Sequence, residues 1–515
     1  MHEAEKPPHA DRAGYVDTLI VGAGLSGIGV ACHLRRDRPR HSYTILEGRG
    51  DLGGTWDLFR YPGVRSDSDL HTLGYAFKPW TGEKVIASGQ AIQDYIRETA
   101  GQHGVLPHIR FGHKVIRADW SGAEGLWTVE ARRTDGEHVL HTCRFLVVST
   151  GYYDYDAGHL PDFPGQDRFK GTFLHPQHWP RDFDHTGRRV VVIGSGATGV
   201  TLVPALADRA RHVTLLQRSP SYVLPVASKD ALADAMRRLL GDRLAHRLTR
   251  RKNIAAQTFV YRLSRRHPRI VKKLLRTLQR RLLPQGYDIG THFGPRYEPW
   301  DQRLCVVPDG DLFKAISSGR ASVVTDRIAA FAEEGIQLAS GALLEADTVV
   351  TATGLNLLAF GGMRLEVDGT PVSLPDTRVY KGCMLSGVPN LAFTVGYINA
   401  SWTLKVDLVC AYLCRLLNRM DATGRWTCVP HHDGGDAGTR PLMDFAAGYV
   451  QRSIDAFPRQ GDAGPWRMNM SYKEDVRELR HGRIEDGVLR FGNPTERTAT
   501  PEPMSSADPT GPTEP

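Results

Sequence analysis

The sequence predicts an α/β fold with two dinucleotide-binding domains of the Rossmann type and a helical insertion in the second domain. Apolar runs at residues 18–21 and 190–193 each lead into a glycine-rich turn, G-x-G-x-x-G, and then into a helical pattern. This is the order of a buried parallel strand, a phosphate-binding turn and a helix. A basic segment with helical spacing, Lys229 to Leu283, predicts the insertion. A chain of 515 residues is too long for one hydrophobic core, so several domains are expected.

The first glycine-rich turn contains Gly22, Gly24 and Gly27. After the helical pattern, the next strand pattern ends at Glu47, twenty positions beyond Gly27. A Rossmann fold places at this spacing the acid that binds a ribose hydroxyl, while the N-terminus of the helix binds the pyrophosphate. Strand, turn, helix and acid together predict a dinucleotide site.

A turn-rich stretch, residues 54–67, follows where a plain Rossmann domain needs only a short loop. Long loops beside cofactor sites are usually functional. The stretch reads G-x-W-x-x-x-x-Y-P-G-x-x-x-D, with Trp56 and Asp67 at two of its fixed positions. A surface loop with a buried tryptophan is the alternative interpretation.

Residues 105–150 alternate in the manner of strands, which predicts a small antiparallel sheet appended to the first domain. Residues 145–151 and 347–354 each form a buried strand pattern that ends in a glycine turn. Each of these two turns is also compatible with an ordinary strand end.

In the second domain, the strand pattern at residues 212–217 is followed by Arg218 and Ser219, at the place that corresponds to Glu47 in the first. A site for NAD needs a carboxylate for the 2′-hydroxyl, whereas arginine with a hydroxyl group suits a 2′-phosphate. The second site is therefore predicted to prefer NADPH over NADH. A solvated strand end is the alternative interpretation of Arg218.

The segment before the second nucleotide-binding strand follows the pattern F-x-G-x-x-x-H-x-x-x-W-P, with Phe169, Gly171, His175, Trp179 and Pro180 at its fixed positions. Five such positions coincide by chance on the order of once in ten thousand chains. The pattern resembles the fingerprint of Baeyer–Villiger monooxygenases, flavoenzymes that use NADPH and dioxygen to insert an oxygen atom beside a carbonyl. Its location predicts a hinge between two cofactor domains, with a buried aromatic linker as the alternative.

Other stretches extend the resemblance. Loop 54–67 is similar to a second signature of that family, in which the tryptophan and the aspartate lie against the flavin. Residues 297–311 and 396–402 make the resemblance close, and it runs from about residue 16 to residue 491. Among Baeyer–Villiger-type enzymes, the chain most resembles the ethionamide-activating FAD-containing monooxygenases.

The resemblance and the motifs together imply two cofactors, FAD and NADPH, and a set of site residues. The expected FAD contacts are Gly22, Gly24, Ser26, Gly27, Glu47, Thr55, Trp56, Asp57, Leu58, Asp67 and Val115. The expected NADP contacts are Arg65, Gly194, Ser195, Gly196, Ala197, Thr198, Gly199, Arg218 and Ser219. The family places on Arg303 the stabilisation of negative charge during oxygen transfer, and Asp67 would orient Arg303; a structural salt bridge is the alternative for Asp67.

The implied reaction inserts one atom of dioxygen next to the carbonyl of a small or medium hydrophobic ketone, giving an ester or lactone. Oxygenation of sulfur in thioethers or thioamides is expected as well. A flavin monooxygenase that acts mainly on nitrogen or sulfur is the nearer alternative, although the Trp179-Pro180 ending argues against that as the sole activity. The remote alternative is a non-catalytic flavoprotein that docks on membranes. A flavin disulfide reductase is excluded because no cysteine pair follows the first glycine-rich turn.

Composition narrows the class of protein. No run of eighteen apolar residues occurs, and the polar N-terminus lacks the apolar core of a signal peptide, so a cytoplasmic protein is expected. The seven cysteines are scattered without a C-x-x-C pair, which indicates neither a disulfide framework nor a zinc site, and no metal is expected. Cys410 and Cys414 are predicted to share one face of a buried helix.

The net charge of +8 is concentrated in one segment. From Lys229 to Arg281, 17 lysines and arginines accompany three aspartates, a local charge of +14, so the rest of the chain carries −6. A solvated face and attraction to anionic lipid at the inner face of the cell membrane are both open interpretations. Nucleic-acid binding is not expected, because stacking aromatics are not interleaved with the basic residues.

These patterns predict a domain plan for the chain. It has disordered tails at residues 1–14 and 493–515, an FAD-binding domain in two segments at 15–155 and 375–492, an NADP-binding domain at 160–225 and 295–374, and the basic helical insertion at 226–294. The sequence does not predict the oligomeric state.

Overall fold

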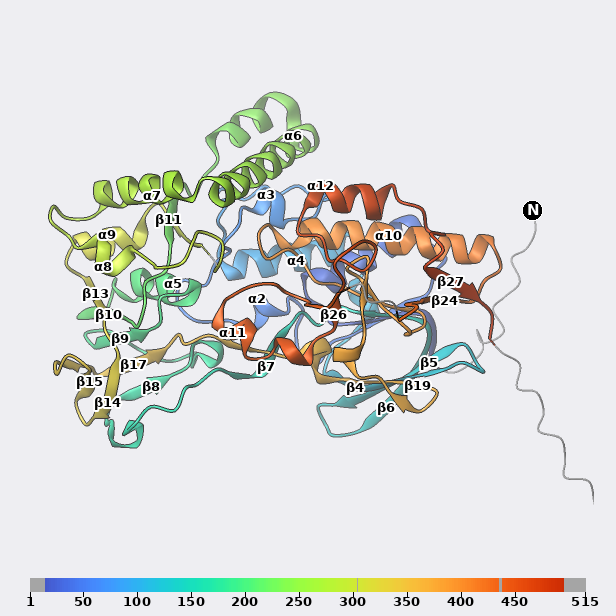
Figure 1. Ribbon diagram of the computed structural model, residues 1–515, viewed down its shortest axis with the longest axis horizontal. Helices are drawn as coiled ribbons and strands as arrows, with labels where there is room; N and C mark the ends of the chain where they lie inside the picture. Colours follow the sequence, from blue (N-terminus) through green and yellow to red (C-terminus); the bar gives the residue numbers. More distant parts are fainter. Residues whose placement is uncertain (1–13, 303, 435–437, 495–515) are drawn as a thin grey trace, which may run out of the picture.

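The computed structural model of the chain describes residues 14–302, 304–434 and 438–494. Two α/β units lie side by side, and a pair of long helices runs along one edge of both (Figure 1). The two predicted tails lie outside the described residues, apart from Gly14, Asn493 and Pro494. Within those described ranges, no helix has the length and apolar character needed to cross a membrane.

The first unit is built on a nine-stranded sheet. Its strands are β1 (Tyr15–Val21), β2 (Tyr43–Leu46), β3 (Ile109–Arg110), β4 (His113–Ser121), β5 (Leu126–Arg133), β6 (His138–Val148), β19 (Arg364–Val367), β20 (Thr370–Pro371) and β23 (Leu391–Phe393). β1 runs parallel to β2 and β6, whereas β5 pairs antiparallel with both β4 and β6. The antiparallel strands expected at 105–150 are therefore part of the main sheet.

Helices cover the parallel part of this sheet. α1 (Leu25–Asp37) packs against α4 (Gly89–Gln102) and against α10 (Trp402–Ala422), which comes from the far end of the chain. Cys410 and Cys414 are both buried on α10, as the sequence predicted. All seven cysteines are buried, and none forms a disulfide bond with a described residue.

The second unit is a five-stranded parallel sheet in the order β13-β10-β9-β17-β8. Its strands are β8 (Thr172–Leu174), β9 (Arg189–Ile193), β10 (His212–Gln217), β13 (Ala321–Thr325) and β17 (Thr348–Thr351), with α5 (Ala197–Leu206) and α9 (Asp311–Ser317) packed on them. A hairpin sheet of β14 (Ile328–Ala332), β15 (Gly335–Leu338) and β16 (Leu343–Glu345) adjoins it. Two Rossmann-like units confirm the predicted fold class.

The chain crosses between the units twice. β7 (Tyr153–Gly158) leads into the second unit, β18 (Leu355–Leu357) leads back, and the two pair antiparallel. The return comes earlier than the boundary expected at residue 374. The reason is that β19 forms a ladder with β4, in which Arg364 is opposite Arg117, and so belongs to the first sheet.

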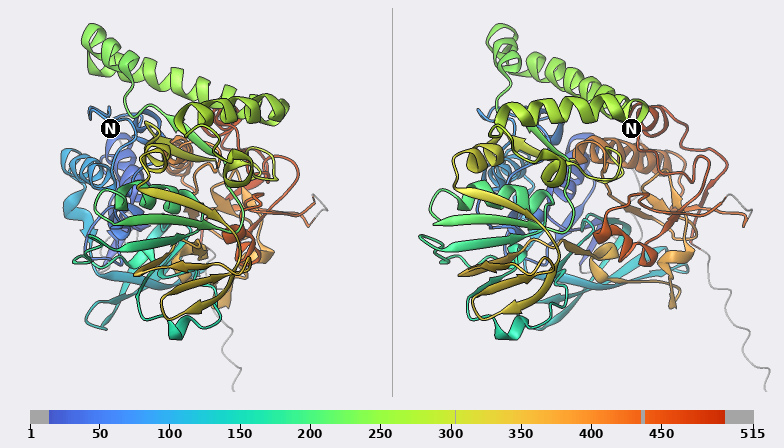
Figure 2. Two further views of the ribbon diagram at one scale, coloured as in Figure 1. Left: turned by 90° about the vertical axis from the view of Figure 1, so that its left-hand side faces the viewer. Right: turned by 60° about the vertical axis from the view of Figure 1, so that its left-hand side comes forward.

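The expected helical insertion consists of α6 (Ala231–Arg266), which is interrupted at Gly241, then α7 (Pro268–Leu282) and the short α8 (Ile289–Phe293). α6 packs on α3 (Leu70–Leu73) of the first unit. In both views of Figure 2, α6 and α7 form the upper edge of the molecule. The insertion therefore contacts both units.

Short elements complete the fold. They are α2 (Thr55–Leu58), β11 (Val223–Val226), β12 (Cys305–Pro308), β21 (Val379–Tyr380), β22 (Met384–Leu385), β24 (Thr427–Pro430), β25 (Arg440–Pro441), α11 (Gly448–Gln451), β26 (Arg459–Gln460), α12 (Tyr472–Asp475) and β27 (Leu489–Gly492).

Candidate functional site

A cavity of about 670 Å³ lies at the carboxyl ends of β1, β2 and β6. Val21, Leu46 and Ser149, which end or directly follow these strands, all line it. Open α/β sheets bind their ligands at this edge of the strands. The cavity also reaches Ala197 and Thr198, at the start of α5 in the second unit.

The first glycine-rich turn forms one wall of the cavity. A Cβ added to Gly27 would lie 1.9 Å from the carbonyl oxygen of Gly22, so only glycine allows α1 to begin this close to β1. Gly24, the residue that precedes α1, provides no side-chain cap for the first N–H groups of the helix, and it lines the cavity. These N–H groups and the positive end of the helix dipole fit the pyrophosphate of a dinucleotide.

Glu47 is buried at the end of β2 and lines the same cavity. Its carboxylate accepts hydrogen bonds from the backbone N–H of Ala23 at 2.7 Å and of Arg49 at 2.9 Å. Burial raises the pKa of Glu47, and the two N–H groups act against that increase. The carboxylate is thus fixed in the position that a ribose hydroxyl of FAD requires.

Three residues predicted for FAD do not line the cavity: Gly27, Asp57 and Leu58. Asp57 lies behind the wall, where its carboxylate accepts hydrogen bonds from Arg49 Nε at 2.7 Å and from Arg60 Nη2 at 2.6 Å. Leu58 is part of the hydrophobic core of the second unit. Asp57 therefore holds the side chain of Arg49, which lines the cavity and which the motif analysis did not identify.

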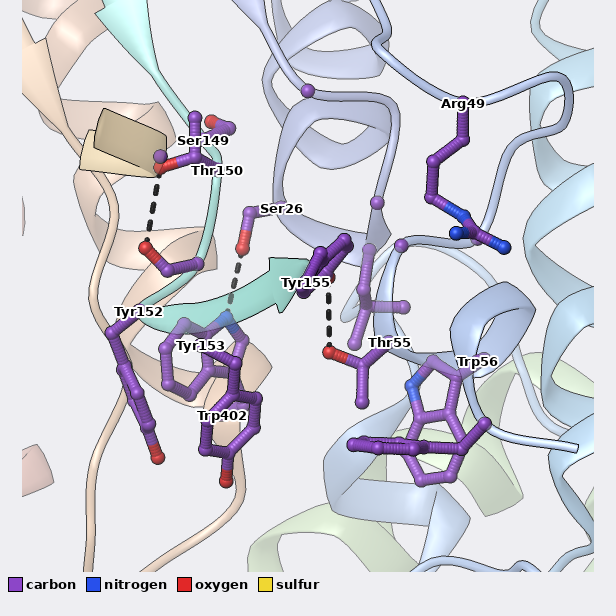
Figure 3. Close-up of a pocket in the computed structure, with 18 of the residues that line it drawn as sticks. Ser26, Arg49, Thr55, Trp56, Ser149, Thr150, Tyr152, Tyr153, Tyr155 and Trp402 are labelled. Carbon is purple, nitrogen blue, oxygen red and sulfur yellow. Dashed lines mark hydrogen bonds between the residues drawn. The ribbon is translucent and has the colours of Figure 1, made fainter. Parts of the chain in front are cut away.

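Aromatic side chains form much of the remaining wall, as Figure 3 shows for Trp56, Tyr152, Tyr153, Tyr155 and Trp402. Trp402 Nε1 donates to Ser26 Oγ at 2.8 Å, and the Tyr155 and Thr55 hydroxyls are 3.2 Å apart. Burial raises the pKa of Tyr155 to about 12, so its hydroxyl stays protonated.

Of these aromatic residues, only Trp56 belonged to the predicted site. Tyr152, Tyr153 and Tyr155 follow the glycine turn that ends at residue 151, and Trp402 ends one of the stretches that carry the resemblance. Both positions in the sequence, after a glycine turn and within a family motif, were signals that could have identified these four aromatic residues as site residues.

The second glycine-rich turn repeats the geometry of the first. A Cβ on Gly199 would lie 1.9 Å from the carbonyl oxygen of Gly194, whereas a Cβ on Gly196 would meet no atom within 4 Å. α5 also begins without a side-chain cap. The turn therefore presents open space and uncapped N–H groups, which fit the pyrophosphate of NADP.

Arg218 and Ser219 follow β10 and are both exposed beside this turn. The Ser195 hydroxyl donates to the carbonyl oxygen of Ser219 at 3.0 Å, which fixes the loop against the turn. Arg218 forms no ion pair with any residue that the structure describes. Its guanidinium is available to a phosphate group.

Arg65 and Asp67 both line the cavity, as does Val115. Arg65 Nη1 forms an ion pair with Asp311 Oδ2 at 2.5 Å, so this predicted NADP contact also connects the loop to α9 of the second unit. Arg303 lies outside the described residues. Val306, on β12 shortly after it, lines the cavity.

The fingerprint segment lies in the second unit, after the first crossing, and none of its residues lines the cavity. Trp179 is buried in the core of the second unit, and the rings of Phe169 and Phe331 are 5.9 Å apart. Gly171 and His175 flank β8, and Pro180 is exposed. Gln177 Nε2 donates to the carbonyl oxygen of Asp154 on β7 at 2.9 Å. The segment is thus bonded to one of the two connections, where a hinge was expected.

Comparisons with known proteins agree with this geometry. The model of the flavin-binding monooxygenase-like family matches residues 85–285, and that of the NAD(P)-binding Rossmann-like domain matches residues 20–80. The chain is 52% identical over 478 residues to the FAD-containing monooxygenase EthA of Mycobacterium tuberculosis, covering 93% of this chain and 98% of that protein. Identity to EthA of Mycolicibacterium smegmatis is 51% over 478 residues, with 93% and 97% covered.

Solved structures support the fold. An oxidised steroid monooxygenase bound to NADP matches with a TM-score of 0.74 and 22% identity, covering 93% of this chain and 100% of that one. The cavity extends from the first glycine-rich turn to the start of α5, directly after the second turn. Together with relatives of this similarity, it gives a consistent result: the chain belongs to the family of FAD-containing monooxygenases and uses FAD and NADP as its cofactors.

Proposed function

We propose that the protein is a Baeyer–Villiger monooxygenase, which inserts one atom of dioxygen next to a ketone carbonyl to give an ester or lactone, and that it also oxygenates sulfur in thioethers or thioamides. The single observation that carries this proposal is the shared cavity. It joins the first glycine-rich turn, at Gly22 and Gly24, to Ala197 and Thr198 at the second. One cavity for both sites favours direct transfer of reducing equivalents between the cofactors.

When bound, NADPH supplies hydride and FAD supplies the chemistry of dioxygen activation. The chain has to bind and orient these groups. Uncapped N–H groups at α1 and α5 would bind the two pyrophosphates, and the Glu47 carboxylate would accept from a ribose hydroxyl. The aromatic wall around Tyr153 and Trp402 would exclude water and select a hydrophobic substrate.

Oxygen transfer to a carbonyl develops negative charge, which the chain must stabilise. A guanidinium is suited to this because it does not deprotonate and its field is strong where water is excluded. We assign this role to Arg303. Asp67, which lines the cavity, is proposed to orient it.

Oxygenation of nitrogen or sulfur alone is the second candidate function. The relatives named FAD-containing monooxygenase support it, because that name does not specify a ketone. Trp179-Pro180, the ending of the fingerprint, favours Baeyer–Villiger oxidation.

Product analysis under labelled dioxygen distinguishes the two reactions. The FAD-loaded protein is incubated with NADPH, ¹⁸O₂ and linear, cyclic and aryl ketones, with a thioether as the parallel substrate. We expect esters or lactones that carry one labelled oxygen atom, and a labelled sulfoxide from the thioether. Sulfoxide formation without any ester, across the whole ketone panel, would support the second candidate function instead.

Arg218→Ala is expected to raise KM for NADPH about 10- to 150-fold, because a lost charge-assisted phosphate contact costs about 1.5 to 3 kcal/mol. KM for NADH should change little, since NADH lacks the 2′-phosphate. Steady-state kinetics with both coenzymes measure this. Arg211→Ala is the matched control, because Arg211 is also exposed but lies at the opposite end of β10. An equal rise for NADPH and NADH would show that the 2′-phosphate is bound elsewhere.

A further inference from the structure

Exposed apolar side chains are concentrated on the helical insertion. Of the 14 large hydrophobic residues that are exposed in the described part of the chain, nine lie on α6 and α7. They are Leu232, Leu239, Leu240, Leu244, Leu248, Phe259, Val260, Ile270 and Leu274. Leu239 is 83% exposed and Phe259 is 66% exposed, values that are unusual for residues of this size.

Cations surround these apolar residues. Eleven arginines and lysines of α6 and α7 are exposed and form no ion pair with a described residue. They are Arg238, Arg243, Arg247, Arg251, Arg262, Arg266, Arg269, Lys273, Arg276, Arg280 and Arg281. We call these eleven, together with the nine apolar residues, the basic–apolar face.

The spacing of six of these residues places the two kinds together on one side of α6. They are Leu244, Leu248, Arg251, Phe259, Arg262 and Arg266, which with Ala255 follow one another at intervals of three or four and so form a single stripe. Arg250 and Thr249 lie outside this stripe and are buried. α7 repeats the arrangement, because Val271 and Leu275 are buried whereas Ile270 and Leu274 are exposed.

The buried side of α6 is firmly attached to the first unit. Arg250 forms an ion pair with Asp407 of α10 at 2.9 Å and donates to the carbonyl oxygen of Gly74 at 2.7 Å. Asn253 and Gln257 each donate to the Asp69 carboxylate, at 2.8 and 2.7 Å. With its buried side bonded in this way, α6 presents a preformed face that needs no rearrangement to bind a partner.

The chemistry of the face selects its partner. A second copy of the chain would bring two positive faces together, which is unfavourable. A nucleic acid would satisfy the cations but would leave leucines unburied, and it would find Phe259 as the one exposed aromatic ring of the face. An anionic bilayer satisfies both components, because its headgroups attract the cations and its acyl boundary accepts the apolar side chains.

We infer that the basic–apolar face of α6 and α7 is a docking surface for an anionic lipid bilayer. Both views of Figure 2 agree with this location, because the two helices form one edge of the molecule with no other ribbon above them.

The attachment of α6 through Arg250 also matters for access to the cavity. Arg250 binds the carbonyl oxygens of Thr72 and Gly74, which flank Leu73 in the cavity lining. Docking would therefore fix the bilayer beside a wall of the cavity.

Vesicle sedimentation with the FAD-loaded protein tests this inference. The vesicles contain either equal parts of phosphatidylglycerol and phosphatidylcholine or phosphatidylcholine alone. We expect binding to the anionic vesicles at low salt, weaker binding at physiological salt, where the screening length is about 8 Å, and little binding to the neutral vesicles. Equal binding to both kinds of vesicle would overturn the inference.

Two variants attribute the binding to the face. The first carries Arg243→Gln, Arg247→Gln, Arg251→Gln and Arg262→Gln; it should lower the vesicle partition coefficient more than about 100-fold, since each cation near the surface contributes a factor of about five. The second carries Leu244→Gln, Leu248→Gln and Phe259→Gln, and it should lower the coefficient about 10-fold or more, through the loss of apolar burial.

A matched control removes the same charge elsewhere. Arg40, Arg132, Arg327 and Arg364 are exposed, are not part of the face and form no ion pair with a described residue. Their combined change to glutamine should leave vesicle binding within about twofold of the parent, because attraction falls off beyond the Debye length. The inference fails if this control loses as much binding as the first variant, or if the first variant binds like the parent. A competition experiment with duplex DNA completes the test: the inference also fails if the DNA removes the protein from anionic vesicles.

Discussion

Asp475→Ala is expected to lower the free energy of unfolding by about 3 to 5 kcal/mol, because the Lys405 ammonium would stay buried without its partner. The two charges are 2.7 Å apart, and their side chains are 1% and 2% exposed. The carboxylate of Asp475 also accepts from the hydroxyl of Tyr397, which lines the cavity. Urea unfolding, followed by circular dichroism and by the release of FAD, measures the change.

A double variant separates the buried charge from the loss of packing. Lys405→Met combined with Asp475→Leu removes both charges and should recover most of the lost stability, as hydrophobic replacements of buried pairs often do. Glu333→Ala is the control, because it breaks an exposed pair with Lys170 and should have no measurable effect. If Asp475→Ala were as stable as this control, the buried pair would not be a structural requirement.

The sequence predicted local structure well where one strong pattern was present. β10, at His212–Gln217, has the predicted bounds, and both glycine-rich turns lie where strand and helix patterns met. The missed boundary near residue 374 has a physical reason. β19 belongs to the first sheet because of its ladder with β4, where Arg364 is opposite Arg117, and a local pattern contains no information about pairing over such a separation.

The same reason explains what was missed at the site. Trp402 reaches Ser26 from the far end of the chain, and their contact depends on the packing of α10 against α1. Asp57 belongs to the loop signature, but its side chain points to Arg49 and Arg60, behind the cavity wall. A motif predicts that a loop lies at the site, whereas the direction of each side chain follows from the tertiary path of that loop.

The largest catalytic effect is expected for Arg303→Ala. Loss of a group that stabilises a developing oxyanion costs about 2.7 to 4 kcal/mol, so ester formation from a ketone should fall about 100- to 1000-fold. FAD should still bind, because the substitution leaves Gly22, Gly24 and Glu47, which line the cavity, unchanged. NADPH should still be consumed, with its electrons released as hydrogen peroxide. Mass analysis of the ester, peroxide detection and the flavin absorbance measure the three quantities.

Arg303→Lys is the sharper variant, because it keeps the positive charge but loses the planar arrangement of donors. We expect it to recover only part of the ester formation. Asp67→Asn is the companion change: if Asp67 orients Arg303, it should reduce the ratio of ester to peroxide in the same direction as Arg303→Ala. The assignment is wrong if Arg303→Ala converts ketone to ester at near the parent rate, since another group would then have to stabilise the developing charge.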